Sequence, residues 1–449
     1  MTKFNRNVDG FIPSHVLLDA ALRNPNALHL TKSLAATQAL WAGSGARTNQ
    51  LFRFGPGAGT GARFIYDAKN GTSRPGTLAR KEGDAATKDA TVNDGYDFHG
   101  IVREYYRIVH GRNSIDGNGM PVKGIVHFDK DYDNAYWDGE YMTYGDGDHT
   151  LFRTFMLLNV AAHELGHGVT EYAVPGGVNY YGMAGANNEH LSDGSGANVE
   201  SWFMNLVFLV KQYLNSHNLS VPATDVHSWF QNMSADVKQG LLALSGVPME
   251  PWLGELACVV SAVPSDLNPT GPVTALSYHW LVGKGIWAPS SDPKAVRRAL
   301  RDMLNPGTAY NDPKLGRDRQ PADMAHYVKT SSDNGGVHTN SSIPNRMYAL
   351  FARGIEEKGL GKDWDSTIGK AGRVWYAARP NLGNNPSFGQ LAVWALEACG
   401  TVFPNEADAL RAALKEACKT VGVVPNKTAI DDLTPVADNS GSGDSIETE

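Results

Sequence analysis

The five residues His-Glu-Leu-Gly-His at positions 163–167 constrain this chain more than any other feature. On a helix, residues four apart lie on one face, so His163 and His167 can present two imidazole nitrogens to one metal ion. Zinc in hydrolytic sites takes three protein ligands and leaves one position open for water. Glu164, one step around the helix, is then placed to take a proton from that water.

A surface helix rich in His and Glu is the alternative, since with 14 His in 449 residues the pattern arises by chance in roughly a few per cent of such chains. The preceding residues 155–162 are largely apolar and contain neither Pro nor Gly. A helix that continues them is half buried, and its polar groups need partners. Pro175 and the two glycines after it end the helix. A bound metal supplies the partners, so we favour the metal site.

The third ligand distinguishes between classes of zinc site. A third His six residues after His167 is excluded, because that position is Ala173. Glu189 lies in a helix-compatible stretch and is the other known solution, since two His and one Glu form a zinc ligand set. Asp193, four residues on, shares its face and is expected to accept a hydrogen bond from a ligating imidazole. The sequence therefore predicts one zinc ion bound by His163, His167 and Glu189.

Further motifs flank the zinc pattern. Residues 131–139 read Asp-Tyr-Asp-Asn-Ala-Tyr-Trp-Asp-Gly and residues 144–148 Tyr-Gly-Asp-Gly-Asp, while residues 333–341 read Asp-Asn-Gly-Gly-Val-His-Thr-Asn-Ser. Together with Arg301, they resemble in order the motifs of the thermolysin family of zinc metallopeptidases. The resemblance implies an α+β fold, a thermolysin-like two-lobe zincin. Its N-terminal lobe is β-rich, its C-terminal lobe is mostly helical, and the zinc-site helix lies between them.

The resemblance also implies catalytic roles outside the zinc motif. His338 is expected to donate a hydrogen bond to the oxyanion of the tetrahedral transition state, with Asp333 holding its ring protonated and oriented. Tyr180, nine residues before Glu189, is the expected second donor. The neighbouring Tyr181 could exchange roles with it, and a packing role for Tyr180 remains an alternative.

Substrate-binding residues follow from the same resemblance. Asn134 and Ala135 would bind the substrate backbone, and Arg301 would hold a backbone carbonyl through its fork of donors. The alternative for Arg301 is a surface position on an amphipathic helix, because Arg297 and Arg298 cluster with it.

Val160 and Leu300 would wall an apolar pocket for the residue just after the scissile bond, although simple core packing explains them equally well. The double calcium site common in the family is not expected here. Asn159 stands where the family has Asp, Glu200 keeps one carboxylate, and residues 279–284 bring a Lys where an anion is expected. Calcium needs six to eight oxygen ligands.

The chain divides into four segments. Residues 1–62 are expected to form a propeptide and junction, since Phe11 to Leu18 resembles the short propeptide of the protealysin-like branch, with Pro13 opening a helix. The Gly-rich stretch 55–61 is a predicted cleavage junction. Residues 63–150 form the predicted β-rich lobe. Residues 151–424 form the zinc-site helix and helical lobe, with a helix over 407–421 and an insertion at about 214–276 expected to fold against that lobe. Residues 425–449 are predicted to be a disordered tail.

Composition agrees with a globular enzyme, because 42% apolar residues in 449 support two or three cores. A net charge of -7 argues against a nucleic-acid partner, and no stretch reaches membrane-spanning length. The three cysteines, Cys258, Cys399 and Cys418, are expected to be buried free thiols. No signal peptide is recognised, so a cytoplasmic location or non-standard export is expected, with secretion as the family-based alternative.

The expected protein is thus a monomeric zinc endopeptidase made as a proenzyme. Its partners would be protein or peptide substrates and its own propeptide, and it would prefer an apolar residue just after the scissile bond. Two rival classes are a catalytically silent binding protein with the same fold and a zinc hydrolase that acts on something other than protein.

Overall fold

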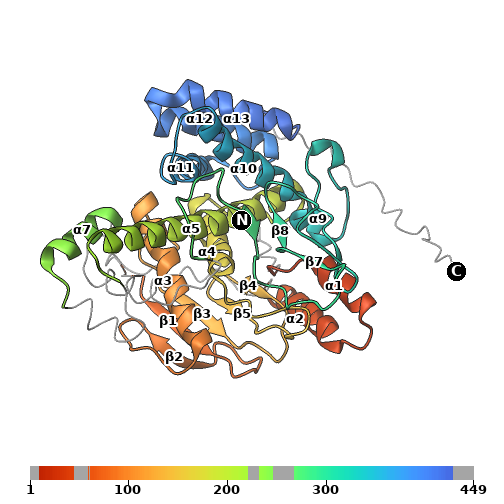
Figure 1. Ribbon diagram of the computed structural model, residues 1–449. Coiled ribbons are helices and arrows are strands. Elements are labelled where there is room, and N and C mark those ends of the chain that lie inside the picture. The colour runs from red at the N-terminus through yellow and green to blue at the C-terminus, as the bar shows by residue number, and fades with distance from the viewer. Residues whose placement is uncertain (1–9, 45–58, 60, 221–231, 246–266, 428–449) are drawn as a thin grey trace.

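The computed structural model describes residues 10–44, 59, 61–220, 232–245 and 267–427. A sheet lobe and a helical lobe lie on opposite sides of two central helices (Figure 1). The predicted two-lobe α+β architecture is confirmed.

The sheet lobe contains five strands in the order β2-β1-β3-β5-β4. β1 pairs in parallel with β3, and β3 with β5, whereas both edge strands are antiparallel to their neighbours. The strands are β1 (Arg63–Asp67), β2 (Thr77–Lys81), β3 (Val122–Val126), β4 (Ala135–Trp137) and β5 (Met142–Tyr144).

A long helix, α3 (Ala90–His110), also belongs to this lobe, for which the sequence predicts mainly strands. Neighbouring parallel strands need a long crossover connection, and α3 provides the one between β1 and β3. The side chain of Asp89 accepts a hydrogen bond from Val92 N at the start of the helix, and Gly111 ends it in the left-handed conformation.

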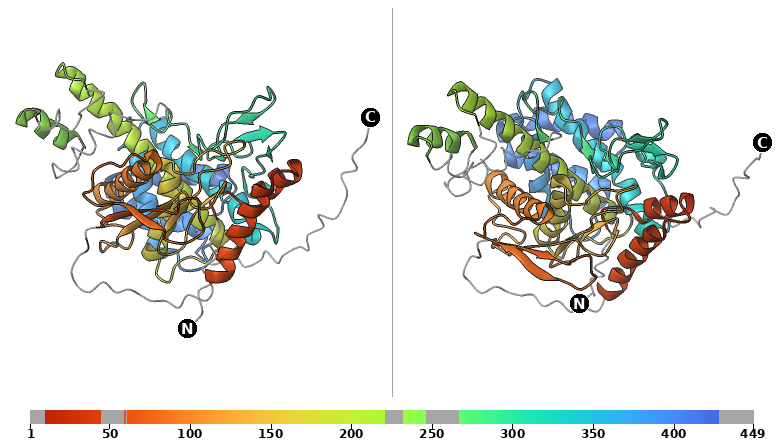
Figure 2. Two further views of the ribbon diagram at one scale, coloured as in Figure 1. Left: turned by 90° about the horizontal axis from the view of Figure 1, so that it is seen from below. Right: turned by 60° about the horizontal axis from the view of Figure 1, so that its bottom comes forward.

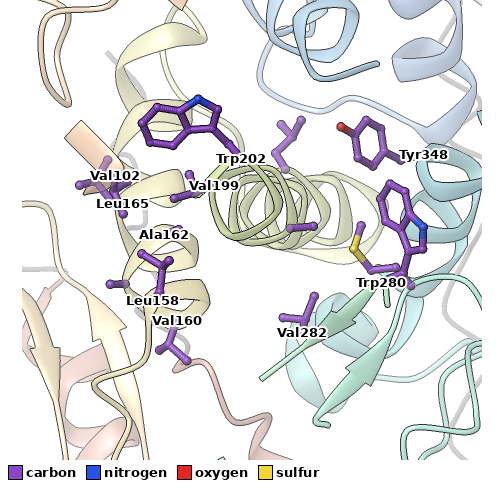
Figure 3. Packing of buried hydrophobic residues seen from close by; sticks show 14 of the residues in the cluster. Val102, Leu158, Val160, Ala162, Leu165, Val199, Trp202, Trp280, Val282 and Tyr348 are labelled. Atoms are coloured by element: carbon purple, nitrogen blue, oxygen red, sulfur yellow. The ribbon is translucent and has the colours of Figure 1, made fainter. Parts of the chain in front are cut away.

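The two central helices are α4 (Leu158–Ala173) and α5 (Gly182–Ser216). They pack closely because glycines lie at their contact. A Cβ atom on Gly166 of α4 would lie 2.8 Å from Ser195 Oγ, and one on Gly196 of α5 would lie 2.9 Å from the carbonyl oxygen of Asn159. Apolar side chains of α4 and α5 fill the core on either side of this contact, and Figure 3 shows Leu158, Ala162, Leu165, Val199 and Trp202 there.

The helical lobe follows a segment of short strands. Those strands form a three-stranded sheet and a two-stranded sheet, and they are β6 (Leu281–Val282), β7 (Val296–Arg297), β8 (Arg301–Asp302), β9 (Tyr310–Asp312) and β10 (Gly316–Arg317). Arg301 is therefore in a strand and only 2% exposed, so the amphipathic-helix alternative for it is wrong. The lobe's helices are α9 (Asp333–Asn340), α10 (Ser342–Glu357), α11 (Ile368–Ala378), α12 (Phe388–Val402) and α13 (Ala407–Thr420), with 3-10 turns η2 (Met324–His326), η3 (Arg379–Asn381) and η4 (Pro404–Glu406). The helix predicted over 407–421 is confirmed as α13.

The N-terminal segment folds into α1 (Ser14–Arg23), directly after Pro13 as predicted, and α2 (Leu28–Ser44). Both helices lie along one side of the molecule (Figure 2). Asn24, just after α1, donates a hydrogen bond to the carbonyl oxygen of Lys314 at 2.9 Å, next to β10. The ammonium of Lys32 on α2 lies 2.7 Å from Asp129 in the sheet lobe. The N-terminal segment therefore contacts both the sheet lobe and the segment of short strands.

The described part of the insertion includes α7 (Ala235–Ser245), which packs against α5. Trp229, Trp252 and Cys258 lie outside the described residues, as do most of the Gly-rich junction and residues 428–449 of the predicted tail. Cys399 and Cys418 are buried free thiols, as predicted. Among the helices of the described segments, none combines the length and apolar character that crossing a membrane requires.

Candidate metal and catalytic site

Two imidazoles of α4 meet one carboxylate of α5 where the two helices pack together. His163 Nε2 lies 3.0 Å from His167 Nε2, and each of these atoms lies 3.5 Å from an oxygen of Glu189. All three residues offer ligand atoms within 4.8 Å of one another. The spacing of four residues within α4 and the close packing on α5 together produce this cluster.

The charge states of the cluster suit a divalent cation. Burial lowers the pKa of His167 to about 4, so its ring is neutral at physiological pH. Burial would raise the pKa of Glu189, but the three histidines around it outweigh burial and lower that pKa. Neutral imidazole and ionised carboxylate are the forms that bind metal. Glu189 Oε2 is buried and accepts no hydrogen bond within the described part of the chain, so the residues present fit a zinc ion.

Further side chains hold the two imidazoles in place. Asp193 Oδ1 lies 3.0 Å from His163 Nδ1, and the side-chain oxygen of Asn188 lies 2.9 Å from His167 Nδ1. Each imidazole thus has a partner on its far nitrogen, which orients the ring and leaves Nε2 facing Glu189.

Asp193 is also the centre of a buried ion pair. Its Oδ1 accepts hydrogen bonds from Arg301 Nε at 3.1 Å and from an Arg301 terminal nitrogen at 2.8 Å, and its Oδ2 accepts one from Asn345 at 2.8 Å. Burial opposes ionisation of Asp193, but Arg301 and His163 outweigh it and hold the pKa of Asp193 well below its usual range. The structure therefore joins Arg301, from β8, to the α4–α5 cluster.

Glu164 lies beside the ligands and is fully buried. Burial, followed by the nearby negative charge of Glu189, raises the pKa of Glu164 well above its usual range. Two carboxylates confined in a buried site repel each other, and a cation between the ligands relieves that repulsion.

His338, Tyr180 and Asp333 converge on the same point. His338 Nε2 lies 3.3 Å from Glu189 Oε2 and 3.3 Å from the Tyr180 hydroxyl, which in turn donates a short hydrogen bond to Glu189. Asp333 Oδ1 lies 2.7 Å from His338 Nδ1. The exposed side chain of Tyr181 lacks these contacts to His338 and Glu189 in the described part of the chain. Of the two tyrosines, Tyr180 is the one beside the cluster.

The backbone before His338 explains how Asp333 reaches it. Asp333 and Asn334 have φ values of 53° and 49°, and two glycines in the same left-handed region follow them. This conformation is costly for residues with a Cβ. It turns the chain back so that Asp333 Oδ2 accepts hydrogen bonds from the backbone N–H groups of His338 and Thr339, at 3.0 and 3.2 Å. His338 itself lies in α9.

Phe11 and Ile12 of the N-terminal segment cover the site. Asn134 Oδ1 accepts a hydrogen bond from Ile12 N at 2.8 Å, Asn134 Nδ2 donates one to Ile12 O at 3.2 Å, and Phe11 N donates one to Ala135 O at 2.8 Å. Arg301 donates a hydrogen bond to Phe11 O at 3.2 Å. The three residues predicted to bind substrate backbone all bind the backbone of this segment.

The Phe11 ring is 1% exposed. Its centroid lies 5.0 Å from the ring of His163, edge to face, and the Arg301 guanidinium lies 4.8 Å from it. A Cβ atom added to Gly283 would come close to both the Phe11 ring and the side chain of Leu300, so Gly283 and Leu300 lie beside the ring. Leu300 therefore belongs to an apolar environment beside the site.

Two family models match the chain: thermolysin metallopeptidase, catalytic domain, over residues 37–171, and thermolysin metallopeptidase, alpha-helical domain, over residues 266–423. An extracellular metalloprotease of Pectobacterium carotovorum subsp. carotovorum is 34% identical over 320 residues, which cover 71% of this chain and 69% of that protein. The chain belongs to the thermolysin metallopeptidase family. Its members are zinc metalloendopeptidases, and the chain belongs to that class of enzyme.

The alignments with other relatives cover different shares of this chain and of the relative. Protease PrtS of Photorhabdus sp. (strain Az29) is 32% identical over 70% of this chain and 64% of its own length. Thermolysin of Alicyclobacillus acidocaldarius subsp. acidocaldarius is 28% identical over 80% of this chain, and only half of that thermolysin's length is matched. Among solved structures, the precursor of protealysin, a metalloproteinase from Serratia proteamaculans, matches with a TM-score of 0.62 and 28% identity, over 93% of this chain and all of that chain. The predicted membership of the protealysin-like branch is confirmed.

The carboxylate of Glu200, at the position of the family's double calcium site, forms hydrogen bonds with other side chains of this thermolysin-family chain. Glu200 Oε1 accepts a hydrogen bond from Asn159 at 2.8 Å, and Glu200 Oε2 accepts one from Tyr278 at 2.6 Å. His279 Nε2 lies 3.4 Å from the same Oε2 atom. Protein donors thus occupy both oxygens of the carboxylate.

Sequence motifs do not reveal the contribution of three residues to the site. Asn188 adjoins Glu189, and its helical position next to a ligand is the only available signal. Asn345 has no local signal, because it reaches Asp193 from 152 residues away. Phe11 belongs to a segment recognised as propeptide-like, but nothing in that segment indicates that its ring lies against His163.

Proposed function

We propose that this protein is a zinc endopeptidase made as an inactive precursor, with His163, His167 and Glu189 binding one zinc ion. The observation that carries the proposal is the buried cluster of these three donors with Glu164 beside it. The chain itself belongs to a family of zinc metalloendopeptidases, which supports this proposal. When bound, zinc would polarise the scissile carbonyl and lower the pKa of the attacking water.

Glu164 is the proposed general base. Its carboxyl group lies beside the three proposed ligands in a buried position, from which it could take a proton from the attacking water and pass it to the leaving amine. His338 and Tyr180 would donate hydrogen bonds to the negative charge that develops on the carbonyl oxygen, and Asp333 would keep His338 protonated. Asn134, Ala135 and Arg301 would hold the substrate backbone, and Asp193 would orient His163 and Arg301.

Loss of zinc is the most direct test of the ligand set. Dialysis against a chelator should abolish cleavage of a blocked dipeptide amide, and added zinc should restore it. A His167→Ala protein should bind zinc at least tenfold more weakly, since loss even of outer partners typically costs about 10- to 100-fold in affinity. Metal analysis checks this against His326→Ala, which changes an exposed histidine. Full zinc occupancy in His167→Ala would contradict the assignment.

The same assay separates the endopeptidase from both rival classes. A silent binding protein would bind zinc without cleaving the amide. A hydrolase for other substrates would leave the peptide bond intact whether or not zinc is present.

The oxyanion donors should affect turnover more than substrate binding. His338→Ala and Tyr180→Phe are expected to lower kcat by about 10²–10³-fold with a smaller change in KM, because the bond forms mainly in the transition state. Steady-state kinetics on one blocked peptide gives both values, and Tyr181→Phe is the matched control because Tyr181 is exposed. An effect of His338→Ala on KM alone would remove His338 from this role.

We infer further that residues 1 to about 55 act as a propeptide that blocks the site. The Phe11–Ile12 backbone uses the hydrogen-bonding groups proposed for substrate, and the Phe11 ring covers His163. A substrate and this segment cannot bind together. The apolar surroundings of Phe11 support an apolar preference just after the scissile bond, with Leu300 as one wall of that pocket and Val160 as a proposed second wall.

Weakening this contact should speed maturation. A Phe11→Ala chain, purified with chelator and started with zinc, is expected to lose its N-terminal segment severalfold faster than wild type, because a buried aromatic contact worth about 3–5 kcal/mol is removed. Leu22→Ala on the exposed side of α1 is the control. N-terminal sequencing follows the reaction. Full activity in a protein that still begins at Met1 or Thr2 would contradict the assignment of this segment as a propeptide.

Three further properties complete the proposal. We expect no calcium at the Glu200 position, because protein donors already occupy both of its oxygens. Action outside the cell is proposed from the similarity to the extracellular Pectobacterium enzyme, and a monomer is proposed as the working form.

A further inference from the structure

A second group of side chains that could hold a metal ion lies where the N-terminal segment meets the sheet lobe, and it shares no residue with the cluster described above. His29 at the start of α2 faces Asp133, just before β4, and Asp148, after β5. His29 Nε2 lies 2.8 Å from Asp148 Oδ2 and 3.8 Å from Asp133 Oδ2. The corresponding distances among the ligands of the first site are 3.0 to 3.5 Å.

Backbone groups aim both carboxylates at His29. Asp148 Oδ1 accepts hydrogen bonds from the backbone N–H groups of residues 150, 151 and 152, at 3.0, 2.8 and 2.8 Å. Asp133 Oδ1 accepts one from the backbone N–H of Asp148 at 2.8 Å. These bonds fix the two Oδ1 atoms and leave both Oδ2 atoms on the side of the imidazole. Only the Thr150 hydroxyl also reaches Asp148 Oδ2 within the described residues.

The environment of Asp133 is a second observation that points to a bound cation. Its side chain is fully buried, and its Oδ2 atom has no hydrogen-bond partner in the part of the chain that the structure describes. Burial and the nearby charge of Asp148 raise the pKa of Asp133 to about 9. A buried carboxyl oxygen without a hydrogen bond is costly, and a cation shared with Asp148 and His29 would remove that cost.

We propose that His29, Asp133 and Asp148 form a second metal site that binds a divalent transition-metal cation, with zinc as the first choice. An imidazole nitrogen with two carboxylate oxygens suits zinc, whereas calcium takes six to eight oxygen ligands. The N-terminal segment supplies one ligand and the sheet lobe supplies two. A cation here fastens α2 to the sheet lobe, and, if the proposed propeptide is correct, it slows release of that propeptide.

The test uses the full-length chain in a Glu164→Gln background, in which intact mass confirms that residue 29 is still attached. After equilibration with buffered free zinc and removal of excess, metal analysis should find two zinc ions per chain. Adding His29→Gln should leave one, and adding His163→Gln instead should also leave one. His326→Gln, at an exposed histidine outside both clusters, should leave two.

These variants separate the two sites. Retention of two zinc ions by His29→Gln, or a single zinc ion lost only with His163→Gln, overturns the second site and leaves the first intact. Loss of one ion in His29→Gln together with no effect of His163→Gln contradicts the first site alone. Asp133→Asn keeps the size and the Oδ1 acceptor of Asp133, so it repeats the test if His29→Gln does not fold. It should also bind a single zinc ion, and two would overturn the proposal.

Discussion

A Glu164→Gln protein is expected to keep its zinc and to lose about a hundredfold to ten-thousandfold of its turnover. The substitution preserves the size of a fully buried side chain and changes none of the three proposed ligands. It replaces the carboxylate with an amide, which is too weak a base to take up the proton. If maturation is self-catalysed, the same protein should also retain its N-terminal segment.

Three measurements on one preparation check this result: metal content, kcat on a blocked dipeptide amide, and the N-terminal sequence after incubation. Glu171→Gln is the matched control, because Glu171 lies on the same helix and accepts a hydrogen bond from Trp137 that Gln can still accept. Near-normal turnover in Glu164→Gln would exclude this residue as the base. A cut chain with low turnover would instead assign maturation to another protease.

Asp193→Asn should lower the free energy of unfolding by about 3–5 kcal/mol. It leaves the guanidinium of Arg301, which is 2% exposed, without its buried counter-charge. Since Arg301 also donates a hydrogen bond to Phe11 O, the N-terminal segment should loosen at the same time.

Unfolding of the zinc-free proteins by guanidinium chloride, in the Glu164→Gln background, measures this loss without a contribution from metal binding. Asp408→Asn is the control, because its ion pair with Arg411 is exposed, and its midpoint should match that of the parent. A midpoint for Asp193→Asn equal to that of the control would show that the buried pair does not stabilise the fold.

Much of the site could be predicted from local spacing. Four residues separate His163 from His167, and the helix that the surrounding sequence predicts is α4. Glu189 and Asp193 are likewise four apart on the next long helix, so one sequence pattern predicts both a ligand and its neighbour. Helical periodicity is a local property, and it remains visible in the sequence without any knowledge of the fold.

Other features depended on residues far apart in the chain. The strand position of Arg301 and its bonds to Asp193, 108 residues away, replace the helix that a cluster of arginines suggested. The role of α3 as a crossover depends on the parallel pairing of β1 with β3, which residues 90–110 alone do not specify, although Asp89 and Gly111 mark the ends of the helix.

The sequence by itself determined the family, the candidate metal-binding cluster and the helix that begins after Pro13, because each depends on residue types at short, fixed spacings. Tertiary structure alone decided what those residues meet. Phe11 lies on His163, Ile12 bonds with Asn134 across 122 residues, and His29 faces Asp148 across 119. The physical reason is that such contacts arise only when packing of the two lobes and the N-terminal segment brings distant parts of the chain together.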